Sequence, residues 1–531
     1  MQLAGNFAEL RPNHFHAGFD FKTNQKEGLN VYATADGYVS RIKISNVGYG
    51  KAIYITHPNG YTTVYGHLQK AAGKIQDKII ENQYEAKEYE IESFFKPNEL
   101  PVKKGDVIGV SGNTGGSEGP HLHFEIRDNK TEKSINPLQF GWDLKDTRIP
   151  QIASLVVFPI SDKSIVNQSK RPISVNLTLQ SDGTFLADKV LATGSIGFGI
   201  IASDFDNVSY NNNGIYKAEL ISNGKPIFGY EFDALDFDEA RKINALIDYG
   251  RYKKSHQRVQ KLFMKNQFSW SNVKSNFENG ITDVLPNFTQ IQRLEVSDFN
   301  GNKVLVFIPI SFSNLPSIIP ADAFITKYLL KAKTDNLYEK GAWTVSFPAN
   351  TFYDDFYINL DLKNNQFVVH EDIVPANSSF VINYQVEKIS ELERKKMFIA
   401  SVQNGKANYI NTIYKDNSFS CKTKNLGTFI IAKDSISPKI SINKVIQNKE
   451  IASIKDLKFF ISDDFSGIKS YNCFLNDEWI LMEYESKLKR LAPNCPNQKL
   501  KEGTNFLKLI AIDNVGNSTT FETQFINSNK N

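Results

Sequence analysis

The stretch Gly119-Pro-His-Leu-His-Phe-Glu125 is the most informative part of this sequence for the fold. Polar and apolar residues alternate along it, and this alternation predicts a strand, because successive side chains of a strand point to opposite faces of a sheet. His121 and His123 would then project from one face, while Leu122 and Phe124 enter the core. Two imidazoles would therefore share one small volume.

Histidines are concentrated in the part of the chain that leads up to this strand. Of the eight histidines in the chain, six precede residue 124, namely His14, His16, His57, His67, His121 and His123. Imidazole is the commonest protein ligand of zinc and the commonest general acid or base near neutral pH, so a metal site is the leading explanation. His16 and Asp20 strengthen it, because they place an imidazole and a carboxylate four residues apart, with Gly18 free to bend the chain between them.

The first 148 residues otherwise read as short strands separated by turns, for example at 38–44, 52–55, 62–65 and 107–110. Phenylalanine and tyrosine are abundant along the whole chain, at 38 and 22 residues, and they favour strands over helices. The sequence therefore predicts a mainly β protein. We leave the segment between Lys74 and Pro101 unassigned, because a lid-like extension and an extra hairpin are equally compatible with it.

A weak internal repeat follows Pro150. Residues 202–206, Ala-Ser-Asp-Phe-Asp, resemble the start of 461–468, Ile-Ser-Asp-Asp-Phe-Ser-Gly-Ile. Each copy is closed by an Asp-x-x-Gly-Asn sequence before a strand, at 298–302 and at 513–517. Asp bonds to its own turn, and Gly and Asn accept positive φ, so we interpret the repeat as a hairpin that closes the edge of a β-sandwich. Calcium binding by these acidic residues is the less favoured interpretation.

These patterns divide the chain into four predicted domains. The first covers residues 1–148 and contains the histidine cluster. Residues 149–313 form a β-sandwich with a helical insertion at about 236–262, where the apolar residues have helical spacing. Residues 314–435 and 436–531 form two further sandwiches. We expect the three sandwiches to be Ig-like.

Composition and charge exclude several classes of function. With 62 Lys and Arg against 58 Asp and Glu, no field of one sign covers the molecule, so a nucleic-acid partner is not expected. Three cysteines are too few to organise the fold, and whether Cys473 pairs with Cys495 stays open. No apolar run reaches the roughly 18 to 20 residues that span a bilayer, so no transmembrane segment is expected. Because the organised sequence begins almost at residue 1, we expect that a signal peptide has been removed upstream.

Taken together, the motifs of the first domain resemble those of the lysostaphin and LytM-type zinc metallopeptidases. The resemblance covers about residues 5–142 and rests on segments in the family's order and spacing: Asn-His-Phe-His-Ala-Gly-Phe-Asp at 13–20, Thr-Ala-Asp-Gly at 34–37, Gly-Tyr-Gly at 48–50, Tyr-Gly-His-Leu at 65–68, Val-Ser-Gly-Asn-Thr-Gly at 110–115 and the stretch 119–125. It implies a LytM-like antiparallel β-sheet peptidase domain in front of the sandwiches. The segment between Lys74 and Pro101 is longer than the short turn of compact members, which leaves the shape of the groove open.

The resemblance implies roles for five residues. In the family, the first His and the Asp of His-x-x-x-Asp and the second His of His-x-His bind the metal, which here means one zinc held by His16, Asp20 and His123. Three protein ligands leave one position open, as a catalytic zinc requires. His67 and His121 are implied to stand beside the metal as the catalytic groups that move protons during peptide hydrolysis.

Other residues near the motifs receive lesser roles. We expect His14 to be a neighbour of the site or a surface residue, and His57 to be a surface residue of a turn. Glu125 is interpreted as a structural hydrogen-bond acceptor. Tyr49 and Tyr65 are equally compatible with substrate contact and with core packing.

The resemblance therefore implies a zinc endopeptidase that cleaves peptide cross-links of bacterial peptidoglycan, either in the periplasm or as a secreted protein. The sandwiches would place it against the wall or against envelope protein partners and contribute no group to the chemistry. The alternative is a catalytically weak or inactive relative that binds wall peptides or activates another hydrolase. All the expected ligands are present, which favours the enzyme.

Overall fold

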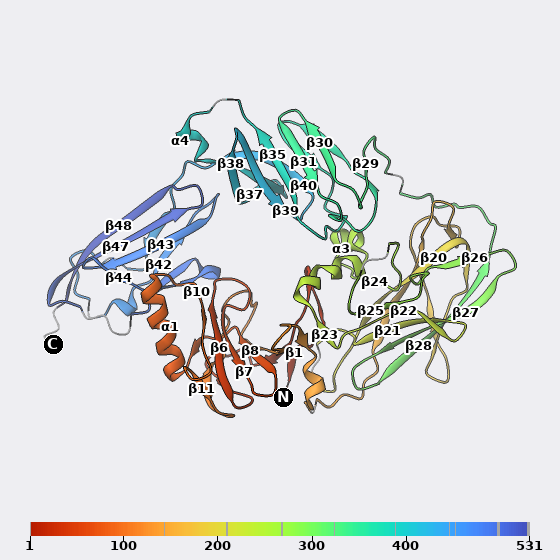
Figure 1. Cartoon of the computed structure of the whole chain (residues 1–531), viewed down its shortest axis with the longest axis horizontal. Coiled ribbons are helices and arrows are strands. Elements are labelled where there is room, and N and C mark those ends of the chain that lie inside the picture. The colour runs from red at the N-terminus through yellow and green to blue at the C-terminus, as the bar shows by residue number, and fades with distance from the viewer. Residues whose placement is uncertain are drawn as a thin grey trace.

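The computed structural model describes residues 2–142, 144–208, 211–266, 269–322, 324–387, 389–444, 446–451, 453–495 and 500–527. Strands dominate, as the sequence predicts, and they form successive sheets along the chain (Figure 1). We call the four groups of sheets units one to four. Among the residues described, no helix combines the length and the apolar character that crossing a membrane requires.

Unit one is built on an antiparallel sheet with the histidine strand near its middle. In spatial order its strands are β1 (Leu3–Gly5), β4 (Phe19–Lys22), β13 (His121–Asp128), β8 (Tyr61–Gly66), β7 (Lys51–Thr56), β6 (Gly37–Ile44) and β10 (Ile91–Phe94), with β11 (Pro101–Val102) and β14 (Ser134–Ile135) at its sides. The predicted alternation holds on β13, where Phe124 is buried and Leu122 packs against the core. The face that carries His121 and His123 is thereby left for the site.

Two smaller sheets complete the strands of unit one. They are the pair β2 (Leu10–Arg11) and β3 (His14–Phe15), and the three-stranded sheet of β5 (Asn30–Tyr32), β12 (Val107–Val110) and β9 (Lys70–Ala71). The segment that the sequence left unassigned begins with a helix, α1 (Gly73–Ala86), and continues into β10 and β11, which both pair with β6. Ile75, Ile79 and Gln83 form the buried side of the helix, one residue on each turn.

Unit two contains the largest sheet. Its main path is β17 (Ile173–Val175), β15 (Gln151–Pro159), β20 (Val190–Ser203), β28 (Lys303–Phe312), β27 (Thr289–Ser297), β21 (Lys217–Ser222), β22 (Lys225–Glu231) and β25 (Val273–Ser275), joined at the sides by β16 (Ile165–Val166), β18 (Leu177–Leu179), β19 (Phe185–Ala187), β24 (Gln260–Lys261) and β26 (Thr282–Val284). Short helices occupy part of the stretch 236–262: η2 (Phe237–Lys242), α2 (Ile243–Leu246) and α3 (Tyr249–Ser255).

Units three and four each contain two antiparallel sheets. In unit three these are β30 (Asn336–Lys340), β31 (Trp343–Phe347), β35 (Phe380–Gln385), β39 (Ser418–Thr423) and β38 (Thr412–Lys415), and β33 (Leu360–Lys363), β34 (Gln366–Val369), β40 (Gly427–Lys433), β36 (Met397–Gln403) and β37 (Lys406–Tyr409), with the pair β29 (Leu329–Leu330) and β32 (Phe356–Tyr357) and the helix α4 (Glu391–Arg394) beside them. In unit four they are β41 (Lys439–Ile442), β42 (Phe459–Ser462), β46 (Arg490–Pro493) and β45 (Met482–Glu485), and β44 (Glu478–Ile480), β43 (Ile468–Leu475), β47 (Gly503–Asp513) and β48 (Ser518–Asn527), with η3 (Ile454–Asp456) and η4 (Ser486–Leu488). All three cysteines are buried and free, so Cys473 and Cys495 are not joined.

Units one and two share a core. The strand β23 (Ala234–Leu235) of unit two pairs with β14 of unit one, so the first sheet continues across the boundary. The ring of Phe15 lies 5.0 Å from that of Phe232 and 5.8 Å from that of Trp270, measured between ring centres. Apolar contact of this kind joins two units into one packed body. The boundary predicted at residues 148 and 149 therefore lies between two units that are in contact.

The chain closes into a ring, because unit four returns to unit one (Figure 1). Trp479 of β44 packs edge-on against Tyr84 of α1, with ring centres 5.3 Å apart. The Lys487 ammonium donates to the backbone oxygen of Asn113 at 2.6 Å, and Lys51 forms an ion pair with Glu483. A helix that the sequence did not predict thus contributes to the contact that closes the ring.

Candidate metal centre and active site

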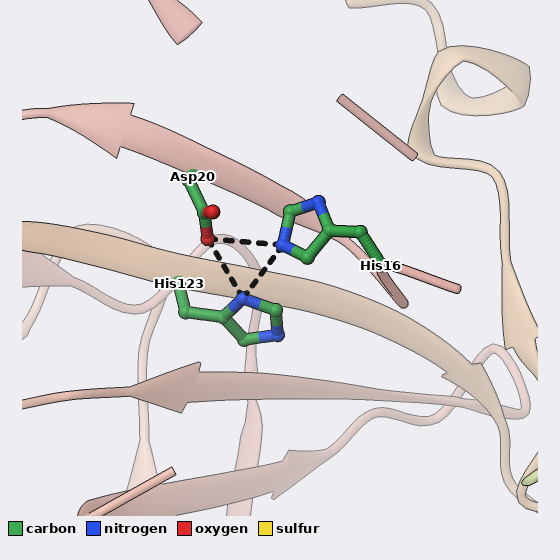
Figure 2. Close-up of side chains that lie close together, drawn as sticks. All are labelled: His16, Asp20 and His123. Atoms are coloured by element: carbon green, nitrogen blue, oxygen red, sulfur yellow. Dashed lines mark hydrogen bonds and ion pairs between the residues drawn. The ribbon is translucent and has the colours of Figure 1, made fainter. Parts of the chain in front are cut away.

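The three residues implied as metal ligands meet on one face of the first sheet (Figure 2). Asp20 on β4 lies directly opposite His123 on β13, so both side chains project from the same face. His16 precedes β4 and reaches the same point from the turn after β3. Gly18 makes this turn possible, because a Cβ at this position would lie 2.1 Å from the backbone oxygen of Phe124.

Three donor atoms converge at the centre. His16 Nε2 lies 3.0 Å from Asp20 Oδ1 and 3.1 Å from His123 Nδ1, and His123 Nδ1 lies 2.9 Å from Asp20 Oδ1. All three residues are buried. These are the three residues that the family resemblance implies as ligands, and they meet here although residues 16 and 123 are far apart in the chain.

The second nitrogen of each ligand imidazole is held by an oxygen that can only accept. His16 Nδ1 lies 2.6 Å from the backbone oxygen of Asn6, and His123 Nε2 lies 2.8 Å from Glu125 Oε1. These nitrogens must therefore donate, and the nitrogens at the centre carry lone pairs when the rings are neutral. This arrangement is the one in which metal-binding histidines are usually held.

Glu125 is the structural acceptor that the sequence predicts. Its side chain is fully buried, accepts from His123 and from the hydroxyl of Tyr49, and binds Arg127 Nε at 2.7 Å. Burial opposes its ionisation, but Arg127 and His123 lower its pKa to about 2. The ring of Tyr49 lies 5.1 Å from that of His123, so this tyrosine packs beside the centre.

His67 and His121 stand beside the three donors. His67 follows β8 with a positive φ of 57°, and its ring centre lies 4.7 Å from that of His121. Their Nδ1 atoms each lie 2.8 Å from a backbone oxygen, that of Thr114 for His67 and that of Gly119 for His121. Both imidazoles therefore donate from Nδ1 and keep the lone pair on Nε2 when neutral.

The electrostatics of the centre favour one bound positive charge. Burial opposes the charge of Asp20, but His16 and hydrogen bonds from His121 and His123 hold its pKa well below the usual range. Burial also disfavours protonated His123, yet hydrogen bonds with Asp20 and Glu125 raise its pKa to about 9. A proton and a metal ion would therefore compete for the same nitrogen. His67 differs, because burial, followed by His123 and His121, lowers its pKa to about 3 and keeps it neutral.

A pocket beside the centre is lined by both unit one and unit two. His14, His16, Tyr49 and His123 form one side. The other side comes from unit two, namely from the end of β23 and the residues after it, Leu235, Asp236, Phe237 and Glu239, and from Trp270. Unit two provides none of the three donors, but it forms a wall of the site, which the sequence did not predict because these residues are more than a hundred positions from the histidines.

The structure also places three residues that received lesser roles in the sequence analysis, and the prediction for His57 is wrong. His57 is buried and not a surface residue, because its ring turns inward to the backbone oxygen of Asp36 and the hydroxyl of Thr63, each at 2.8 Å. Tyr65 is a core residue, 1% exposed. His14 is exposed on β3 and lines the pocket, in agreement with its predicted place near the site.

The sequence around the centre matches a known protein family. The sequence profile of peptidase family M23 matches residues 14–88 and 89–137, a span that contains all five implied site residues. The N-terminal part of the chain is thus an M23 peptidase domain of the lysostaphin and LytM type. A Zu5-like domain profile matches residues 327–434, which include most of unit three.

Three individual relatives each match about a quarter of this chain. The DD-carboxypeptidase/endopeptidase Mpg of Neisseria meningitidis serogroup B is 37% identical over 123 residues, which are 23% of this chain and 22% of that protein. The peptidoglycan DD-endopeptidase ShyC of Vibrio cholerae serotype O1 is 30% identical over 140 residues, 26% of this chain and 24% of that protein. The catalytic domain of lysostaphin from Staphylococcus simulans is 26% identical, covers 25% of this chain and 87% of its own, and has a TM-score of 0.19. The chain thus spans about a fifth to a quarter of the length of these curated relatives.

Proposed function

We propose that this protein is a zinc-dependent endopeptidase that hydrolyses peptide cross-links of bacterial peptidoglycan. The observation that carries the proposal is the convergence of His16, Asp20 and His123 beside a pocket within an M23 peptidase domain. The substrate class is supported by relatives that are named peptidoglycan DD-endopeptidases. The proposed location is therefore the bacterial envelope, in the periplasm or outside the cell.

The donor set suits zinc. Ligands at roughly 2.0–2.1 Å around a tetrahedral zinc stand about 3.3 Å apart, close to the separations of 2.9–3.1 Å between these donors. His16 Nε2, Asp20 Oδ1 and His123 Nδ1 would hold one zinc per chain. When bound, the zinc would act as a Lewis acid that polarises the scissile carbonyl and increases the acidity of water.

His67 and His121 are proposed as the catalytic residues that move the proton. The neutral state of His67 leaves Nε2 able to accept a proton from the attacking water. His121 is less buried than the three donors and lies next to Asp20, with Nε2 3.3 Å from Asp20 Oδ1. When its Nε2 carries a proton, His121 can donate a hydrogen bond to the substrate carbonyl or pass that proton to the departing amine. The backbone oxygens of Thr114 and Gly119 orient the two rings.

The test of the substrate is digestion of purified peptidoglycan by the full chain with one equivalent of zinc. We expect cross-linked peptide dimers to be converted to monomers, with the new amino and carboxyl ends identified by mass spectrometry. The His123→Ala protein under the same conditions is the control. Unchanged dimers in the presence of bound zinc would exclude peptidoglycan cross-links and direct the search to protein substrates.

The second candidate is a catalytically weak or inactive protein that binds wall peptides or activates another hydrolase. This candidate has weight because most of the chain lies outside the M23 domain. Units three and four contribute no residue to the described lining of the pocket, so a binding role would suit them. In that case the chain would bind wall fragments and stimulate a second hydrolase without releasing monomers itself. The digestion experiment therefore separates the two candidates.

The wall from unit two is expected to affect substrate binding more than metal binding. Phe237 is 41% exposed at the pocket, where its ring can contact a substrate peptide. Replacing it by alanine should raise KM and lower kcat/KM by roughly fivefold, because one aromatic contact of about 1 kcal/mol is lost. Zinc content should stay the same. Phe277→Ala, which removes an exposed ring of unit two outside the pocket lining, is the matched control, and equal kcat/KM in both variants would show that the wall does not contact substrate.

The remaining assignments are also proposals. We propose four domains at 1–148, 149–313, 314–435 and 436–531, with units one and two joined through their shared core. Units three and four are proposed to bind the wall or envelope protein partners. No nucleic acid is proposed as a partner.

A further inference from the structure

A second group of possible metal ligands lies away from the histidines, where unit one joins unit two. Carboxylate oxygens of Asp146, Asp204 and Asp298 all lie within 4.8 Å of one another. Asp146 is in the connection that leads into β15, Asp204 follows β20, and Asp298 follows β27. Asp204 and Asp298 are 5% and 3% exposed. Three acidic groups from three separate segments therefore meet in the interior.

Two of the three carboxylates are fixed by their own turns. Asp298 accepts the backbone N–H of Asn302 at 2.8 Å and its side-chain amide at 2.6 Å. That same amide also donates to the backbone oxygen of Asp146 at 3.2 Å, and the Asp146 side chain accepts from the N–H of Arg148 at 3.0 Å. The Asp-x-x-Gly-Asn turn thus has the role predicted from the sequence. In addition, it holds the linker against the end of β27.

The third carboxylate, that of Asp204, has an oxygen that receives no hydrogen bond from these turns. Asp204 Oδ1 is buried without a hydrogen-bond partner, and so is Oδ1 of Asn213. The two residues exchange backbone hydrogen bonds of 3.0 and 2.8 Å as an antiparallel pair, so their side chains lie on the same face. An oxygen of this kind can be satisfied only by a donor or a cation, and leaving it unpaired is costly. Two unpaired acceptors beside two further carboxylates indicate that a cation belongs between them.

The charge of the group supports the same reading. Within the described residues, no Lys or Arg forms an ion pair with these three carboxylates. Burial, followed by the charges of Asp146 and Asp298, raises the pKa of Asp204 to about 8. The Asp204 carboxyl therefore favours either a proton or a metal ion over an isolated negative charge. The three aspartates also line one cavity, which they share with Tyr216, Asn136 and several apolar side chains such as Phe19 and Phe232.

We propose that Asp146, Asp204 and Asp298, together with Asn213, form a site for a hard divalent cation of the calcium class at the junction of units one and two. Oxygen ligands from carboxylates and an amide are the set that calcium prefers, and the group offers no imidazole or thiolate that would favour zinc. The cation would join the linker to the ends of two strands of unit two. Gly214, beside Asn213, exchanges hydrogen bonds with the side chain of Asn6, whose backbone oxygen accepts from His16. The site would therefore fasten the segment that orients a residue of the metal centre.

The second copy of the repeat provides a matched comparison within the same chain. Lys145-Asp-Thr-Arg-Ile-Pro150 corresponds to Lys433-Asp-Ser-Ile-Ser-Pro438, and Asp434, Asp463 and Asp513 form the equivalent group. Asn517 bonds to Asp513 and to the backbone of Asp434 in the same way as Asn302 does in the first copy. The difference is at Asp463, whose carboxylate accepts the N–H groups of Phe465 and Gly467 at 3.0 and 2.7 Å. Backbone donors thus satisfy this carboxylate, whereas Asp204 keeps an open oxygen.

Calcium titration of the full chain tests the proposal. The His16→Ala protein is used as the parent, so that the ions do not act through the histidine centre, and it is freed of metals beforehand. At about 2 mM CaCl₂ the midpoint temperature of the first unfolding transition should rise by roughly 5 °C. A shift of this size is expected when an ion is present at many times its dissociation constant. Calorimetric titration should give a stoichiometry of about one. Adding Asp204→Asn should remove both effects, whereas adding Asp463→Asn should leave them.

A further expectation keeps the test independent of folding defects. Without calcium, Asp204→Asn should melt at the same temperature as the parent or higher, because it relieves repulsion among the three carboxylates. Asp146→Asn, in the partly exposed linker, is the second variant and should also lose the calcium response. The proposal is overturned if calcium does not shift the parent, or if the shift survives in Asp204→Asn and Asp146→Asn. Neither result bears on peptide hydrolysis, so this test is separate from that of the proposed function.

Discussion

Replacing His16 or His123 by alanine should remove the bound zinc and lower peptide hydrolysis by at least about a thousandfold. Each imidazole supplies one of only three protein donors, and the two remaining donors leave the ion poorly held. The Lewis-acid contribution of a catalytic metal is worth several kcal/mol, and about 4 kcal/mol corresponds to a factor of a thousand in rate. Zinc per chain, measured by atomic emission after dialysis, should fall from about one to near zero.

The measurement should be made at about pH 9 or above, because the proton that the raised pKa of His123 favours competes with the ion at lower pH. His14→Ala is the matched control, since His14 lines the same pocket and is exposed. It should keep its zinc and most of its activity. Full zinc content in both His16→Ala and His123→Ala would refute the ligand assignment.

His67→Ala and His121→Ala should show the opposite combination, with zinc retained and hydrolysis slowed by about 10²- to 10⁴-fold. Neither residue is among the three converging donors, so loss of either ring leaves the ligands in place. What is lost is an imidazole whose Nδ1 is held by a backbone oxygen and whose Nε2 can take part in proton transfer. Turnover of a cross-linked wall peptide and zinc content are measured on the same samples.

His57→Ala is the control for a general effect of removing a buried imidazole. His57 is as deeply buried as His16, but its ring is bonded to Asp36 and Thr63 away from the pocket. It should lower thermal stability without a comparable loss of turnover at moderate temperature. Near-normal turnover in His121→Ala with full zinc would mean that another group moves the proton, and His14 would then be examined first.

The ligand set of the centre was implied by the family resemblance, and short-range rules account for only parts of its geometry. Alternation in 119–125 fixes the common face of His121 and His123, and Gly18 lets His16 and Asp20 converge. His57 was misjudged because a turn sequence follows it, which indicates an exposed backbone. The direction of its ring, however, depends on Thr63 across the hairpin and on Asp36 in another segment.

Features that arise between distant segments could not be predicted. The helix α1 has apolar residues at Ile75 and Ile79, but the third buried position of that side is Gln83, so the apolar stripe is too short to stand out. The wall from unit two depends on β23 pairing with β14, a contact of about a hundred residues' separation that no local pattern encodes. The same reason explains why the acidic residues of the repeat were read only as turn residues.

The closed ring also has a thermodynamic consequence. Units four and one are parts of the same chain, so each meets the other at an effective concentration on the order of millimolar, which favours their association. Several of their contacts are polar and partly exposed, and salt weakens such contacts. We therefore expect an equilibrium between joined and separated units whose position ionic strength can shift. Because Lys487 bonds to Asn113, next to the residue that orients His67, that equilibrium reaches the edge of the active site.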